Sequence, residues 1–169
     1  MGLRLTVPES LARTEWYGRG PGESYSDTKL AGRVGVYRMA TDDLYVRYIY
    51  PQENGNRADV RWVAFTDLRG VGLFASPVRD GSADASFSFS ALRYDAAELE
   101  KAQHTYDLVP RKEFVVHLDH AHHGIGSASC GPDVLPQYVL HAGEFSFRTR
   151  LTPFTADSLS PVTLDKQVL

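Results

Sequence analysis

The sequence of 169 residues predicts an all-β protein built as an antiparallel β-sandwich. Three segments alternate apolar and polar side chains with the two-residue period of a half-buried strand: 57–62 (RADVRW), 85–91 (ASFSFSA) and 144–151 (EFSFRTRL). The 9 Tyr, 8 Phe and 2 Trp residues stand largely in alternating runs, and aromatic side chains favour strands. Only 95–103 (DAAELEKAQ) has a helical pattern, so strands and turns are expected to dominate.

The elements follow in chain order from the same patterns. Weaker strand candidates, with less regular alternation, are 3–7, 14–17, 33–39, 44–50, 70–75, 113–121 and 137–141. In the three regular segments the large apolar residues share one face: Ala58, Val60 and Trp62; Phe87 and Phe89; Phe145, Phe147 and Leu151. Asp95 is placed to cap the one short helix. The alternation is lost after Leu151, which predicts a sandwich domain over 1–154 and a loosely attached tail over 155–169.

Charge and cysteine content exclude several classes of protein. The formal net charge is -3, so no broad basic surface is expected to bind nucleic acid or an anionic membrane. No apolar run approaches the roughly 20 residues of a membrane-spanning helix. Cys130 is the single cysteine, which excludes an intrachain disulfide and favours a reducing compartment such as the cytoplasm.

The stretch 18–27 (GRGPGESYSD) raises the question of a phosphate-binding loop. Such a loop needs glycines between a strand and a helix, so that free N–H groups and the positive helix end meet the phosphate. Pro21 removes one donor, and the residues that follow contain neither the phosphate-binding lysine nor an amphipathic helix. The stretch is therefore predicted to be an ordered loop between strands.

Four blocks of the sequence resemble a known family. The stretches WYGRGPGESYSD (16–27), PQENGNRADVRWV (51–63), FSALRYDAAELEKAQHTYDL (89–108) and GIGSASCGPDVLPQY (124–138) are similar, in this order, to blocks in the C-terminal region of bacterial glycoside hydrolase family 2 β-galactosidases. This region is also called the small chain or domain 5. Lys29 stands near the position where the family pattern carries Arg, and Cys130–Gly131 replace a tryptophan found in some members.

The resemblance implies an accessory role. Family members cleave terminal β-D-galactose residues from lactose-type substrates by retaining hydrolysis, which requires two carboxyl groups about 5–5.5 Å apart. In the family both groups belong to a separate (β/α)₈ barrel of roughly 250 residues, and this chain is too short to contain one. We therefore expect no catalytic residue here, no cofactor in this domain, and any Mg²⁺ or Na⁺ in the absent barrel.

The resemblance also implies the fold and the partners. The family's C-terminal domain is an antiparallel supersandwich related in architecture to galactose mutarotases, and this chain corresponds to its later part. Strand edges that the missing part would cover make the remainder of the β-galactosidase chain and further copies in a homo-oligomer the expected partners. The galactoside substrate would be bound only by the intact enzyme.

Two sets of residues are carried over from the family. The first is a loop at the edge of the sugar pocket in the intact enzyme: Ser129, Cys130, Gly131 and Asp133. The second set is expected to hold turns in shape through mutual hydrogen bonds: Trp16, Gly18, Gly20, Pro21, Glu23, Tyr25, Asp27, Glu53, Asn54, Gly55 and Arg57. No metal is predicted at the histidine-rich stretch 117–124 (HLDHAHHG), because its spacing matches no dinuclear zinc motif.

Two alternatives from other classes stay open. A free-standing carbohydrate-binding module would use aromatic residues such as Trp16, Trp62 and Tyr50 as stacking platforms for sugar rings. An aldose epimerase of the mutarotase type would need a general base and a general acid facing one pocket, and a His and a Glu would suit that chemistry.

Overall fold

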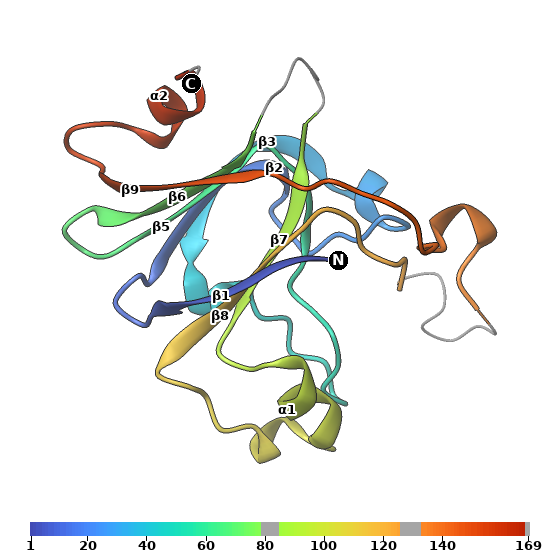
Figure 1. Cartoon of the computed structure of the whole chain (residues 1–169). Helices are drawn as coiled ribbons and strands as arrows, with labels where there is room; N and C mark the ends of the chain where they lie inside the picture. Colours follow the sequence, from blue (N-terminus) through green and yellow to red (C-terminus); the bar gives the residue numbers. More distant parts are fainter. Residues whose placement is uncertain (79–84, 126–132, 168–169) are drawn as a thin grey trace.

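The computed structural model describes residues 1–78, 85–125 and 133–167, which form two antiparallel sheets (Figure 1). The four-stranded sheet has the order β1 (Gly2–Pro8), β8 (Glu113–Asp119), β7 (Phe87–Leu92) and β4 (Arg57–Val60). The five-stranded sheet has the order β3 (Arg33–Ala40), β2 (Arg13–Gly20), β5 (Trp62–Thr66), β6 (Val71–Pro77) and β9 (Thr149–Thr155). The prediction of an all-β antiparallel sandwich is confirmed.

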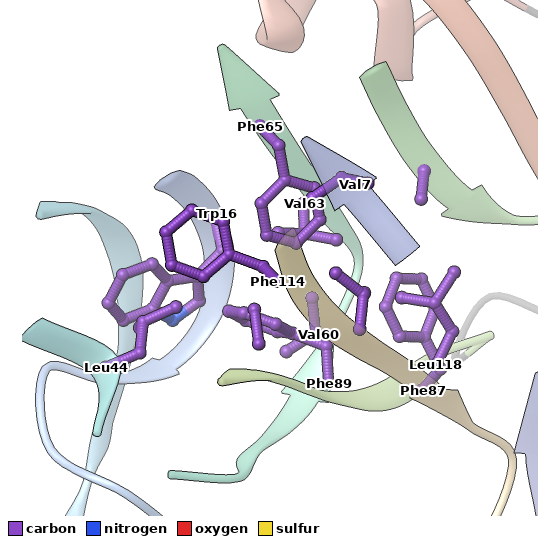
Figure 2. Packing of buried hydrophobic residues seen from close by; sticks show 13 residues of the cluster. Val7, Trp16, Leu44, Val60, Val63, Phe65, Phe87, Phe89, Phe114 and Leu118 are labelled. Carbon is purple, nitrogen blue, oxygen red and sulfur yellow. The ribbon is translucent and has the colours of Figure 1, made fainter. Parts of the chain in front are cut away.

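The core lies between the inner faces of the two sheets (Figure 2). Large apolar side chains from both sheets meet there: Val7, Phe87, Phe89, Phe114 and Leu118 from the four-stranded sheet, and Trp16, Val63 and Phe65 from the five-stranded sheet. Each is nearly or fully buried, and burying one such side chain stabilises the fold by about 1.5–3 kcal/mol. The faces predicted for 85–91 agree, since Phe87 and Phe89 both point inward.

The segment 57–62 is not one strand, contrary to expectation. Asp59 has φ 54°, a left-handed conformation that interrupts the extended chain, and Val60 and Trp62 then enter different apolar layers. Arg19 Nε (2.7 Å) and Lys29 Nζ (2.8 Å) pair with the Asp59 carboxylate. Burial works against the charge of this carboxylate, but the two cations outweigh it and lower its pKa. The segment is thus a corner at which the chain passes from β4 to β5.

The outer face of the five-stranded sheet carries a second apolar layer. Trp62, Phe74 and Phe154 pack there with Leu164 of α2 (Pro161–Asp165). Leu164 is 1% exposed, and the Arg150 guanidinium donates to its carbonyl oxygen at 2.6 Å. The predicted loose tail over 155–169 is therefore wrong for its described part. Pro161 begins this helix after the Ser160 cap, where its missing N–H costs nothing.

Three other segments also differ from the prediction. Residues 44–50 and 137–141 contain no strand: a 3₁₀ turn ends at Leu44, another spans Pro136–Tyr138, and irregular chain follows each. The strand predicted over 144–151 begins only at Thr149, and Phe145 and Leu151 are about half exposed rather than buried on one face. Pairing explains the shift, because residues 149–155 run along β6 in register.

The helix predicted near 95–103 is confirmed as α1 (Ala96–Lys101), and its start matches the expected cap. The Asp95 carboxylate accepts from the Glu98 N–H at 2.9 Å, while the Glu98 side chain accepts from the Asp95 N–H at 2.8 Å. No helix in the described parts of the chain has the length and apolar character needed to cross a bilayer.

Candidate functional site

Two loops that are distant in sequence form one structure, which we call the loop platform: residues 21–28 and 51–57. Two hydrogen bonds join them through Ser24 and Asn56, and a third joins Ser24 to Ala58 of β4. The Ser24 N–H donates to the Asn56 carbonyl at 2.7 Å, and the Asn56 side-chain amide returns a bond of 2.7 Å to the Ser24 carbonyl. The Ala58 N–H donates to the Ser24 hydroxyl at 3.0 Å. All three residues are buried, so these hydrogen bonds satisfy polar groups that water does not reach and hold the two loops together.

Glu23 extends this link as an acceptor. Its carboxylate accepts from the Gly55 N–H at 2.8 Å and from the Tyr48 hydroxyl. The hydrogen bond to Glu23, together with burial, raises the pKa of Tyr48 to about 12, so Tyr48 stays protonated as the donor. Gly55 has φ 77°, and a Cβ there would lie 2.8 Å from the Leu44 carbonyl oxygen. Glycine is therefore required at this position.

Arg57 is the most buried charged residue of the platform, at 2% exposed. Its guanidinium donates to the carbonyl oxygens of Gly55 (2.7 Å), Pro21 (3.2 Å) and Leu44 (3.3 Å) and stacks over the Trp16 ring at 5.5 Å. Burial lowers its pKa to about 10, and the charge of Glu23 opposes that effect. Arg57 thus ties three chain segments together through backbone acceptors.

The glycines of 18–27 serve close packing. A Cβ at Gly18 would lie 2.7 Å from the Val60 side chain, and one at Gly20 would lie 2.7 Å from the Tyr37 ring. The Gly20–Pro21 peptide bond is cis, and no α-helix follows it: the next turn is 3₁₀ (Lys29–Ala31). The loop lacks the strand–helix geometry of a phosphate site.

Tyr25 connects the platform to the histidine-rich segment that follows β8. Its hydroxyl donates to Glu53 Oε1 at 3.4 Å, and its ring meets the edge of His122 at a centroid distance of 5.4 Å and 71°. Burial, with the charges of Glu53 and Glu23, raises the pKa of Tyr25 far above its ordinary value. A Cβ on Gly124 would lie 3.0 Å from Asp27 Cγ, so this segment lies directly against the platform.

A cavity of about 210 Å³ opens beside Glu53 and His122. The outer face of β7 and β8 forms its floor and α1 part of its wall. Met1 lines it at one side, and its polar side chains are those of Glu53, Ser90, Tyr94, His117, Asp119 and His122. A His and a Glu therefore line one cavity, which is the residue pair that the epimerase alternative needs.

The predicted pocket-edge loop lies mostly outside the described residues. Ser129, Cys130 and Gly131 belong to 126–132, whereas Asp133 is exposed and its carboxylate accepts from the Val134 N–H at 2.7 Å. The described flanks of this segment are both anchored. Gly124 is buried and its N–H donates to the Tyr138 carbonyl at 3.1 Å, and Val134 is 5% exposed.

The residues of the second predicted set lie in two places. Trp16, Gly18 and Gly20 belong to β2, and the others belong to the platform: Pro21, Glu23, Tyr25, Asp27, Glu53, Asn54, Gly55 and Arg57. Asn54 is fully buried, and its side chain accepts from the Val46 N–H at 3.0 Å and donates to the Gln52 carbonyl at 2.9 Å. Neither set of carried-over residues included Ser90 or Asp119, because their position at the cavity depends on strand register.

The stacking surface expected of a carbohydrate-binding module is not formed by the tryptophans. Trp16 is 0% and Trp62 1% exposed, and each packs in an apolar cluster of one of the two layers. Neither ring can lie against a sugar. The described parts of the chain also contain no group of three or more His, Cys, Asp and Glu side chains that could hold a metal ion.

Fold and site together define the class: a two-sheet antiparallel β-domain in which buried polar side chains lock the loops. Comparison with known proteins gives the family. A sequence model described as beta galactosidase small chain matches residues 1–151, and the chain belongs to this family. The predicted resemblance is thereby confirmed.

Similar proteins include three β-galactosidases. The chain is 35% identical over 142 residues to that of Arthrobacter sp. (strain B7) and 37% over 147 residues to that of Kluyveromyces lactis, covering 83% and 87% of the chain. It is 32% identical over 154 residues, 90% of the chain, to that of Pseudoalteromonas haloplanktis. The chain spans only 14% of the length of each of these relatives.

Proposed function

We propose that this chain is the C-terminal part of a β-galactosidase, in which it positions a loop at the edge of the sugar pocket while another domain hydrolyses the galactoside. The whole enzyme would release terminal β-D-galactose from lactose-type substrates. This chain would contribute Ser129, Cys130, Gly131 and Asp133 to the pocket edge and would have no hydrolase activity by itself.

The observation that carries the proposal is the locked base of segment 126–132. Tyr25 and Asp27 of the loop platform lie against His122 and Gly124, and the platform is itself tied together by buried hydrogen bonds. A loop that contributes to a pocket of another domain needs such a rigid support, because a displacement of about 1 Å weakens substrate positioning. The match to 14% of each β-galactosidase agrees with a supporting part of a larger enzyme.

Two carboxyl groups, those of Glu53 and Asp119, line the same cavity and must be weighed as a hydrolytic pair. The cavity volume argues against this role. At about 210 Å³ the cavity is smaller than the roughly 300–1,000 Å³ of typical ligand sites, which leaves little room for the sugars on both sides of a scissile bond. A glycosidase must hold the sugar on both sides of the bond it cleaves. We therefore assign hydrolysis to another domain of the β-galactosidase.

The remaining parts of the proposal concern partners and location. The partners would be the rest of the β-galactosidase chain and further copies in a homo-oligomer. Val34 and Val36 of the edge strand β3 are each about half exposed and offer an apolar surface for such contacts. We place the enzyme in the cytoplasm, with any Mg²⁺ or Na⁺ bound by the catalytic domain.

A chimera tests this function. The matching segment of the Arthrobacter sp. β-galactosidase is replaced by this chain, and hydrolysis of o-nitrophenyl β-D-galactoside is measured. We expect a folded chimera to retain turnover, and Cys130→Trp to change KM more than kcat, because the side chain would contact the substrate without reacting. The isolated chain is expected to be inactive. Turnover by the isolated chain that disappears in Glu53→Gln or Asp119→Asn, or a folded chimera without turnover, would contradict the proposal.

A further inference from the structure

The cavity beside His122 is lined by polar groups from four separate segments. Ser90 of β7 and His117 and Asp119 of β8 point to it from the sheet, and Glu53 and His122 come from loops on either side. Apolar side chains complete the wall: Leu92, Leu99 and Val115. This mixture of a few polar groups on an apolar wall is typical of a small-molecule site.

Several of these polar groups have hydrogen-bonding capacity to spare. His122 Nδ1 is buried and has no hydrogen-bond partner among the described residues. A buried polar atom without a partner costs about 1–3 kcal/mol, so such an atom beside a cavity indicates a missing ligand or solvent molecule. Glu53 accepts one long hydrogen bond, from Tyr25 at 3.4 Å, and Asp119 lies 3.6 Å from the amino group of Met1.

Burial sets the protonation of several groups in the lining and so decides which hydrogen bonds they can make. Burial raises the pKa of Glu53, with a further contribution from the charge of Asp119. Burial lowers the pKa values of His117 and His122, and the Asp119 charge opposes this in part. Near neutral pH the two imidazoles are therefore uncharged and can each donate and accept one hydrogen bond. Carboxylates and neutral imidazoles together suit hydroxyl groups.

We propose that this cavity binds one neutral monosaccharide, with hydroxyl groups donating to the carboxyl groups of Glu53 and Asp119 and bonding to the imidazoles of His117 and His122. The volume of about 210 Å³ lies below that of typical ligand sites, which restricts the ligand to a small molecule such as one sugar ring. The inference concerns this cavity and not the pocket-edge loop of the proposed function. Only the choice of D-galactose as the probe rests on that function.

A second concave surface competes as a sugar site. It is a groove of about 750 Å³ lined by Tyr45, Tyr94 and Tyr106. Its charged residues include Arg93, which is already bonded to Asp42 at 2.6 Å, and its volume is more than three times that of the smaller cavity. We therefore assign the monosaccharide to the smaller cavity, and binding in the groove becomes an outcome of the test.

The test is an NMR titration of the full chain with D-galactose, in which ¹⁵N shifts report the imidazoles. We expect millimolar affinity, with saturable changes at His117 and His122 and no change at Tyr106. Ser90→Val narrows the cavity and His122→Phe removes both imidazole nitrogens, so each should weaken binding roughly tenfold. Tyr106→Ala, on the exposed groove, is the matched control and should bind as the wild type. Thermal unfolding checks that every variant is folded.

Three results would overturn the proposal. One is the absence of imidazole shifts at the highest sugar concentration, and another is a response confined to Tyr45 and Tyr106, which line the groove and not the cavity. The third is unchanged affinity in both a folded Ser90→Val and a folded His122→Phe variant. If the chimera lacks hydrolysis while the isolated chain still binds the sugar, only the proposed function fails. If the chimera is active and no imidazole shifts, only this inference fails.

Discussion

Replacing Arg57 by Met tests whether backbone carbonyls, rather than a carboxylate, hold this buried cation in place. Methionine has a similar length and keeps the apolar contact with Trp16, but it donates no hydrogen bond. The carbonyl oxygens of Gly55, Pro21 and Leu44 would then lose their guanidinium donors. The substitution therefore isolates the polar role of the side chain from its packing role.

The expected magnitude is the difference of two effects. A buried acceptor without a partner costs about 1–3 kcal/mol, so three acceptors cost roughly 5 kcal/mol, since two of the bonds are long. Against this, Arg57 has its pKa lowered to about 10 by burial. The corresponding penalty for burying the cation is on the order of 3 kcal/mol at about 1.36 kcal/mol per pKa unit, and the substitution removes it. The net loss is about 2 kcal/mol.

Thermal unfolding followed by circular dichroism measures this loss. For a chain of this size about 1 kcal/mol shifts Tm by roughly 2–4 °C, so Arg57→Met should lower Tm by roughly 4–8 °C. Arg57→Lys should lower it at least as much, because lysine keeps the buried charge and reaches fewer carbonyls. Arg38→Met is the control. The Arg38 side chain is 77% exposed and pairs with Glu15 at 3.0 Å, which predicts an effect under about 1 kcal/mol. A wild-type Tm in both Arg57 variants would refute the reasoning.

Three shorter predictions address other parts of the fold. Burial raises the pKa of Glu53, so the stability of the wild type falls as the pH rises through that pKa. The Tm of Glu53→Gln relative to the wild type should therefore increase between pH 4 and pH 8. A Tm difference that does not change with pH would contradict this. Leu164→Ala should lower the free energy of unfolding, measured in urea, by about 2–5 kcal/mol. A loss under about 1 kcal/mol would mean that α2 does not pack firmly against the sheet. Gly55→Ala should lower the free energy of unfolding by about 1–3 kcal/mol, because φ is 77° and the new Cβ would clash with the Leu44 carbonyl. The control is Gly22→Ala, which has open space around the new Cβ and should change Tm little.

Much of the sheet structure could be predicted from alternation, and its failures have physical causes. The pattern in 57–62 is regular, yet Asp59 adopts a left-handed conformation supported by Arg19 and Lys29. Sequence alone gives no sign of this, since both cations are distant in the chain. In 44–50 the Val46 N–H bonds the Asn54 side chain instead of a neighbouring strand. The apolar residues there alternate, but the backbone is used by the loop platform.

The candidate sites likewise differ in how far the sequence could predict them. The quoted residue blocks pointed to the loops that form the platform, because loop-forming residues are local signals. The cavity was not foreseen as a site. Ser90, His117 and Asp119 reach it only because β7 and β8 pair with Ser90 opposite His117, a register that no spacing in the sequence reveals. The histidine-rich stretch drew attention to His122, but its contact with Tyr25 depends on the folded loops.

The hydrogen bonds within the loop platform indicate where a ligand can bind. Glu23 bonds to Gly55, Ser24 to Asn56 and Arg57 to Pro21, so the polar groups of each block face the backbone of the other. Groups that are occupied in this way have little capacity for a substrate, and the spacing within the motif is set by the fit between two loops. Among the described residues, buried polar atoms without a hydrogen-bond partner remain within the platform, at Ser26 Oγ and Asn56 Oδ1, and at its border, at His122 Nδ1. Of these three residues, His122 is the one that lines the cavity of about 210 Å³, so a ligand is expected at this border of the platform.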